Sequence, residues 1–78
     1  MTRKMYFTFG SDPGFPYGRD DYVLVEADSY RACLDKYKER HPNRTPGLIN
    51  CAEYYTESSW KSVAEAWYKG RQPAEVIR

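Results

Sequence analysis

Residues 4–9 read KMYFTF, and residues 22–26 read YVLVE. In the first segment Met5, Phe7 and Phe9 alternate with the other three residues, which is the period-two pattern of a strand with one buried face. The second segment is apolar and β-branched between acidic neighbours. We therefore predict that the two segments form neighbouring antiparallel strands.

Two helices are predicted from apolar side chains at positions i, i+3, i+4 and i+7. These side chains are Tyr30, Cys33, Leu34 and Tyr37 in the first helix, and Trp60, Val63, Ala64 and Trp67 in the second. Asp28 and Thr56 are the expected N-caps. The first helix should end at His41, and the second should span residues 57–69, with Gly70 just past its end. Both tryptophans are therefore expected in the core.

The remaining apolar segment, residues 48–55, is predicted as a third strand. The expected fold is a single α+β domain over residues 1–78, in the order β-β-α-β-α. It has a small antiparallel three-stranded sheet with two helices packed on one face. Residues 70–78 form a tail, in which Val76 and Ile77 either dock as a short extended piece or fray. The other sheet face is then left partly open.

The loop between the first two strands, residues 10–20, reads GSDPGFPYGRD and is longer than the usual hairpin loop. Its evenly spaced glycines resemble a phosphate loop, but it leads into a strand and its prolines lack N–H groups. We interpret it instead as a contact loop that presents aromatic rings, a cation and carboxylates. The candidate ligand-binding residues are Ser11, Asp12, Phe15, Tyr17 and Arg19 of the loop, with Tyr6 and Tyr22 of the open sheet face.

Composition narrows the classes of partner. The 78 residues carry 12 Lys+Arg against 11 Asp+Glu, and this balance argues against a nucleic-acid partner. No leader and no membrane-spanning stretch is recognised, so the expected location is the cytoplasm. Eight tyrosines in so short a chain favour a homo-oligomer. Cys33 and Cys51 lack zinc-site spacing, so we expect free thiols, no metal and no cofactor.

Catalytic residues are sparse. The single histidine, His41, lies eight residues from Cys33, about 12 Å along a helix, so a Cys-His dyad is not expected. We interpret His41 as a cation at the end of a helix. Asp12, Asp20 and Asp21 favour turn and solubility roles, and the enzymatic alternative that they leave open is a small metal-dependent nuclease or phosphoesterase.

The chain resembles small uncharacterised proteins of bacteriophages and prophages of Gram-positive bacteria. The resemblance lies in Tyr6 to Ser11, Phe15 to Tyr17, Val23 to Ala27, and Asn50 through Tyr55 to Trp60. It implies an accessory protein, in the cytoplasm of the host cell, that binds a host protein or sequesters a nucleotide signal of host immunity. With no catalytic set in view, the leading hypothesis is such a non-enzymatic binding protein, acting through the 10–20 loop. A structural or assembly protein, with the loop as a subunit contact, is a further alternative.

Overall fold

The computed structural model describes residues 2–78. Its elements in chain order are β1 (Arg3–Thr8), β2 (Tyr22–Ala27), α1 (Tyr30–Arg40), β3 (Glu53–Thr56), α2 (Glu57–Trp67) and β4 (Glu75–Ile77). The strands form one sheet in the order β3-β1-β2-β4. β1 is antiparallel to β2 and β3, whereas β4 is parallel to β2. The α+β class is as predicted, but the sheet is mixed and four-stranded.

The fourth strand forms from the segment expected as a tail. Gly70 has a positive φ of 78°, a conformation that glycine adopts easily, and it lies in the turn after α2. The Ala74 N–H then donates to the carbonyl of Tyr22 at 2.8 Å, which starts the pairing with β2. The register places Val76 beside Leu24. Residues 75–77 therefore dock as an edge strand.

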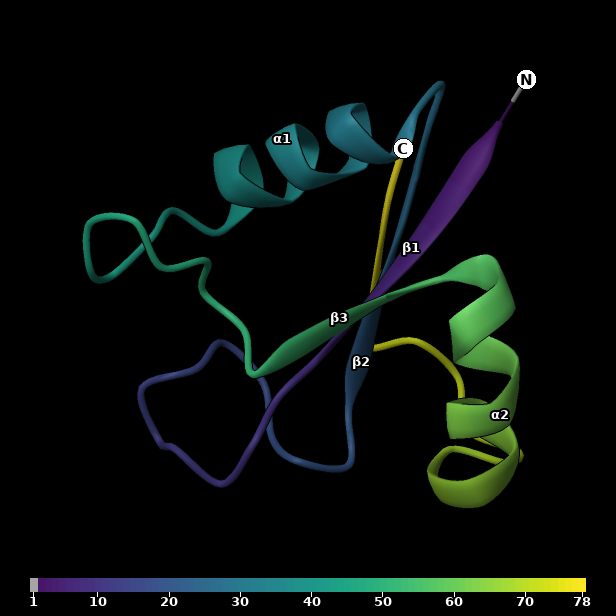
Figure 1. The fold of residues 1–78 in the computed structure, drawn as a ribbon. Helices are drawn as coiled ribbons and strands as arrows, with labels where there is room; N and C mark the ends of the chain where they lie inside the picture. Colours follow the sequence, from purple (N-terminus) through teal and green to yellow (C-terminus); the bar gives the residue numbers. More distant parts are fainter. Residues whose placement is uncertain (1) are drawn as a thin grey trace.

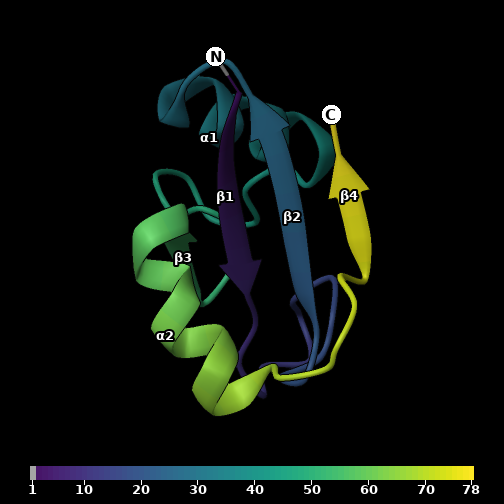
Figure 2. The ribbon, with the colours of Figure 1, turned by 90° about the vertical axis from the view of Figure 1, so that its right-hand side faces the viewer.

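The two helices lie on opposite faces of the sheet, as Figure 1 and Figure 2 show from two directions. On one face Phe7 stacks on Tyr37 of α1, with ring centroids 4.1 Å apart. On the other face Tyr6 stacks on Trp60 of α2 at 4.7 Å. The prediction that both helices cover one face is wrong. Both faces of β1 carry large rings, and each face needs a helix to remove its rings from water.

The face expected to be open is therefore partly covered. Tyr22 also lies against Trp60, with ring centroids 4.8 Å apart, and its hydroxyl donates to the carbonyl of Arg71. Val76 at the sheet edge keeps 39% of its surface exposed. Two of the candidate binding residues, Tyr6 and Tyr22, thus belong to a packed layer of rings beneath α2.

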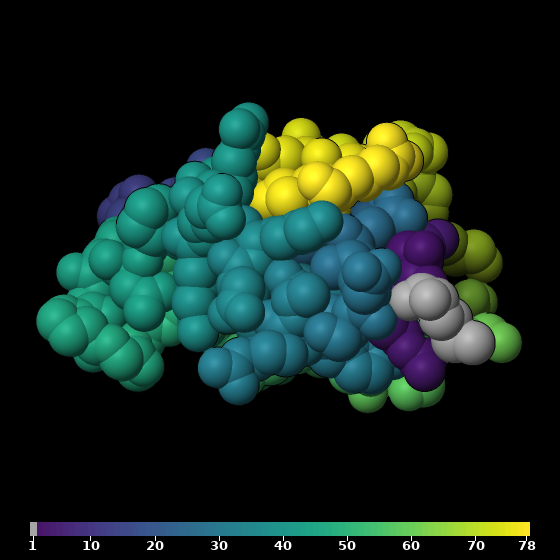
Figure 3. Space-filling model, turned by 90° about the horizontal axis from the view of Figure 1, so that it is seen from above, coloured from purple at the N-terminus to yellow at the C-terminus, as the bar shows by residue number. Residues whose placement is uncertain are grey.

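The third strand is shorter than predicted. β3 covers Glu53–Thr56, and residues 41–52 before it form a loop without a helix or regular strand. Cys51 in that loop is buried against the core, and the Ala52 N–H donates to the carbonyl of Thr8 at 2.9 Å. Seen from above, the teal-green chain around residues 42–48 projects at one end, and the yellow C-terminal strand lies beside the blue of β2 and α1 (Figure 3).

The N-cap of α1 is Ser29 rather than Asp28. The Ser29 Oγ accepts a hydrogen bond from the Ala32 N–H at 3.0 Å, which satisfies one of the free N–H groups of the first turn. Thr56 is the N-cap of α2, as predicted, but its side chain makes no capping hydrogen bond.

We expect Ser29→Ala to lower the free energy of unfolding by about 1 kcal/mol, because the Ala32 N–H loses its acceptor. Asp28→Ala, one residue earlier, should change it by less than about 0.5 kcal/mol. Urea denaturation followed by circular dichroism measures both. A larger loss for Asp28→Ala would show that the predicted cap is the operative one.

Candidate functional site

A cavity of about 860 Å³ lies at the end of the sheet where β1 ends and where β2 and β3 begin. The C-terminal end of α2, which is at the bottom of Figure 2, also contributes to its lining. Its volume is in the range of ligand-binding sites. It is lined by Phe9, Gly10, Ser11, Arg19, Asp20, Glu53, Trp67 and Tyr68. We refer to it below as the Trp67 cavity.

Trp67 is the most exposed large apolar side chain on the rim of this cavity. It is 77% exposed, whereas Trp60, seven residues earlier on the same helix, is 7% exposed. The prediction that both tryptophans lie in the core is therefore correct for Trp60 and wrong for Trp67. An indole that the fold leaves in water is the kind of side chain that proteins use to bind partners.

The charged residues of the lining are two carboxylates, Asp20 and Glu53, and one guanidinium, Arg19. The hydrogen bonds and ion pairs found within residues 2–78 include none that the Arg19 guanidinium makes. The backbone carbonyl of Arg19, in contrast, accepts a hydrogen bond from the Tyr68 hydroxyl at 3.3 Å. The lining thus carries an excess of one negative charge.

Two tyrosine hydroxyls lie close to these carboxylates. The Tyr55 hydroxyl donates to Oε2 of Glu53 at 2.7 Å, and this hydrogen bond, with burial, raises the pKa of Tyr55 to about 12. Burial raises the pKa of Tyr68, and the charges of Asp20 and Asp21 raise it further. Both phenols are therefore protonated at neutral pH, and the lining keeps its excess of one negative charge.

The rings of the 10–20 loop are directed inward. Phe15 and Tyr17 are half-buried and pack on Phe9, with ring centroids 6.2 and 5.6 Å away. The Arg44 guanidinium covers the outer side of Phe15, 4.8 Å from the ring centroid. A Cβ on Gly14 would overlap that guanidinium, so glycine permits the close approach. These rings anchor the loop to the core.

Two aspartates hold the turns of the loop: Asp12 within it and Asp21 just after it. The Asp12 carboxylate accepts from the Gly14 N–H at 2.8 Å and from Arg44 Nη2 at 3.3 Å, and these two bonds lower the pKa of Asp12. Oδ2 of Asp21 accepts from the Gly18 N–H at 3.1 Å. Nowhere in residues 2–78 do three His, Cys, Asp or Glu side chains gather as a metal site would require.

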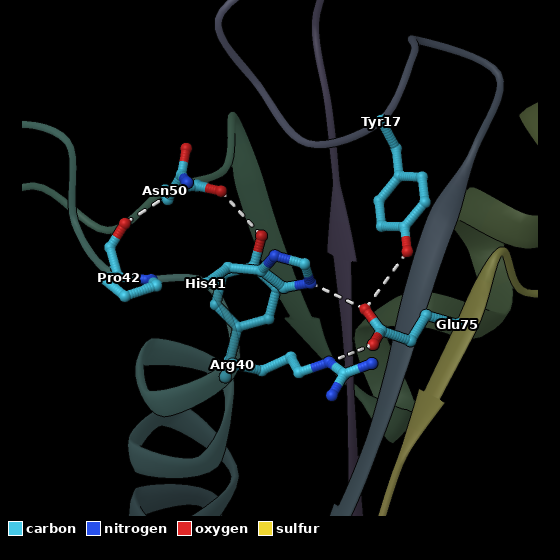
Figure 4. Close-up of polar contacts among 7 residues, drawn as sticks. Tyr17, Arg40, His41, Pro42, Asn50 and Glu75 are labelled. Atoms are coloured by element: carbon cyan, nitrogen blue, oxygen red, sulfur yellow. Dashed lines mark hydrogen bonds and ion pairs between the residues drawn. The ribbon is translucent and has the colours of Figure 1, made fainter.

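Glu75 on β4 joins three parts of the fold (Figure 4). Its Oε1 accepts from the Tyr17 hydroxyl at 3.2 Å and from His41 Nε2 at 2.6 Å, while Oε2 accepts from Arg40 Nε at 2.6 Å. Burial opposes ionisation of Glu75, but the hydrogen bonds from His41 and Arg40 outweigh it and lower the pKa of this carboxyl. We call these four residues the Glu75 cluster.

The histidine was predicted as a cation at the end of a helix, and it does lie at the C-cap of α1. The sequence gives no sign of its partner, because Glu75 is distant along the chain. The two cysteines are free and buried, and burial raises the pKa of Cys33 and that of Cys51, the latter to about 12. Thiols with raised pKa values are poor nucleophiles at neutral pH.

The structure brings together the five candidate binding residues of the 10–20 loop but not the two of the sheet. Ser11, Asp12, Phe15, Tyr17 and Arg19 all line a second cavity of about 440 Å³, formed by the loop itself. Of these, only Ser11 and Arg19 also line the Trp67 cavity, whereas Asp12 and Phe15 contact Arg44 and Tyr17 belongs to the Glu75 cluster. Tyr6 and Tyr22 lie beneath α2. The hypothesis missed Trp67 and Glu53, which join the site only because the end of α2 and the start of β3 meet there.

Comparison with known proteins finds no matching family model, curated protein or solved structure. The resemblance to phage proteins therefore stays an expectation, and no residue role is carried over from a relative. Among residues 2–78, no helix has the length and apolar character needed to cross a membrane.

Proposed function

We propose that this chain is a non-enzymatic binding protein that holds a partner protein at the Trp67 cavity. The observation that carries the proposal is the 77% exposed indole of Trp67 at the rim of a cavity of about 860 Å³. Tryptophan is enriched among the residues that dominate binding energy in interfaces, and a cavity allows a partner side chain to be desolvated beside it.

The charge of the lining favours a protein partner over a nucleotide. A nucleotide phosphate would meet the single guanidinium of Arg19 together with the carboxylates of Asp20 and Glu53. Because Arg19, Asp20 and Glu53 are all exposed, an effective dielectric of about 40–80 applies, and at about 7 Å each charge changes the binding energy by roughly 0.6–1.2 kcal/mol, so the two carboxylates together outweigh the arginine. In the setting that the resemblance to phage proteins implies, the partner is a host protein, and binding inhibits it.

A selection from a random peptide library tests the proposal. We expect the immobilised chain to enrich peptides that lose at least tenfold in affinity for Trp67→Ala, because a tryptophan at the centre of an interface contributes about 2 kcal/mol or more. Lys61→Ala, an exposed change on the same helix, should leave their affinity unchanged. Peptides that bind Trp67→Ala as tightly as the wild type would reject the cavity as the binding site.

A thermal-shift assay with a panel of linear and cyclic nucleotides tests the competing ligand class. A ligand present at 100 times its dissociation constant stabilises the folded state by about 2.7 kcal/mol, which such an assay detects readily. We expect no shift. A nucleotide that stabilises the wild type but not Arg19→Ala would show that the cavity binds an anionic ligand, and would reject the protein partner.

A further inference from the structure

We infer that the group of the partner that enters the Trp67 cavity is an arginine side chain, an inference that rests on the proposed function. The rim offers the exposed indole of Trp67, and the lining adds the carboxylates of Asp20 and Glu53. A guanidinium is planar and cationic, so it can stack on an indole while its N–H groups donate in pairs to a carboxylate.

The acceptors of the site are only partly used within the protein. Oε2 of Glu53 accepts from the Tyr55 hydroxyl, and Glu53 itself is exposed. Asp20 is exposed as well, and its side chain makes none of the hydrogen bonds or ion pairs found within residues 2–78. An ionised carboxylate offers about four acceptor positions, so both groups retain capacity for an incoming donor.

Arginine fits this combination better than the other cations. A lysine ammonium is a compact, strongly hydrated charge that can pair with Asp20 or Glu53 but has no flat face to lay on Trp67. A quaternary ammonium can lie over the indole but has no N–H to donate to the carboxylates. The imidazolium of histidine is flat and donates N–H groups, but with an ordinary pKa of about 6.5 histidine is mostly uncharged at neutral pH. The guanidinium is therefore the cation that uses both parts of the cavity at neutral pH.

The effect of Arg19→Ala on affinity should have opposite signs for cationic and anionic ligands. Its guanidinium lines the same cavity, so it repels an incoming cation and attracts an incoming anion. Arg19→Ala should therefore tighten an arginine-bearing ligand by about three- to tenfold and weaken an anionic ligand by a similar factor. The two ligand classes predict opposite changes for the same variant.

The direct test titrates the protein with N-acetyl-arginine amide, and follows the indole N–H resonance of Trp67 by NMR. The Trp67→Phe variant assigns that resonance against Trp60. N-acetyl-citrulline amide, the neutral analogue of the same shape, is the matched control, and N-acetyl-lysine amide tests the competing cation. We expect saturable binding of the arginine amide, at least tenfold tighter than the citrulline amide and tighter than the lysine amide. Equal binding of the arginine and citrulline amides would overturn the inference.

Charge-removing variants show which carboxylates bind the arginine amide. Asp20→Asn and Glu53→Gln should each weaken the arginine amide by about three- to tenfold, while Glu65→Gln on the outer surface of α2 should leave it unchanged. The peptide selection distinguishes failure of the proposed function from failure of the arginine inference. If the selected peptides need Trp67 but contain no arginine, the proposed function stands and this inference is rejected. If the selection yields no peptide that needs Trp67, both are rejected.

Discussion

Trp60→Ala is expected to lower the free energy of unfolding by about 3–5 kcal/mol, the range for removing a large buried ring. The Trp60 indole is 7% exposed and lies parallel to the Tyr6 ring, at an interplanar angle of 5°. It also contacts Tyr22, Tyr55 and Tyr68, at centroid distances between 4.8 and 5.8 Å. Its removal leaves one face of the sheet without the ring that joins it to α2.

This loss is large for so small a domain. A chain of this length has a free energy of unfolding of about 4–12 kcal/mol, so the variant would lose between a quarter and all of it. Urea denaturation followed by circular dichroism measures the loss. Trp67→Ala is the matched control, since Trp67 is 77% exposed on the same helix, and it should change the free energy by less than about 1 kcal/mol. Similar losses in the two variants would contradict the assignment of Trp60 to the core and Trp67 to the surface.

The two tryptophans also show what periodicity can and cannot predict. Trp60 and Trp67 share one stripe of α2, and the stripe predicts that both face the same direction. It does not predict how far the sheet extends beneath the helix. β3 has only four residues, and the last turn of α2 lies beside the cavity at the end of the sheet. Burial of Trp67 was therefore a question of tertiary structure, which no local pattern answers.

Much of the fold followed from local signals. The alternation in β1 and the apolar run of β2 predicted both strands and their antiparallel pairing, and the stripe of α1 predicted a helix that ends near His41. The sequence does not decide whether the segment of β4 docks or frays, because Val76 and Ile77 form too short a segment to show a period. The placement of the helices on opposite faces is not predicted, because Tyr6 is assigned to an open sheet face as a candidate binding residue, whereas it stacks on Trp60.

The sequence predicts only part of the candidate site. Ser11 and Arg19 were identified because the 10–20 loop is unusual in length and composition. Phe15 and Tyr17 were expected to be displayed, but a loop of this length needs anchors, and these rings supply them by packing on Phe9. A pattern of aromatic residues in a loop does not distinguish rings that bind a partner from rings that fix the loop.

The Glu75 cluster holds three segments of the chain together. Its carboxylate links the C-terminal end of α1, the 10–20 loop and β4, through Arg40, His41 and Tyr17. The side chains of Glu75 and His41 are only 13% and 17% exposed, so a lost partner cannot be replaced freely by water. Glu75→Gln keeps the shape but removes the charge, and it should lower the free energy of unfolding by about 2 kcal/mol.

The pH dependence of this difference identifies its origin. The pKa of Glu75 in the folded state lies below its ordinary value of 4.5, so the folded state binds the proton more weakly than the unfolded state. The stabilisation by Glu75 is therefore present in full above about pH 5. It is lost as the pH falls below 4.5 and through the folded-state pKa, because the protonated carboxyl no longer attracts Arg40 and His41.

Melting temperatures of the wild type and Glu75→Gln between pH 7 and pH 3 test both parts of this argument. We expect a difference of about 8–16 °C near neutral pH, because 1 kcal/mol corresponds to about 4–8 °C in a domain of this size. The difference should shrink as the pH falls below 4.5. Glu26→Gln, which removes a pair with the 76% exposed Arg78, is the control and should lower stability by less than about 1 kcal/mol. A difference for Glu75→Gln that is unchanged at pH 3 would show that shape rather than charge holds the three segments together.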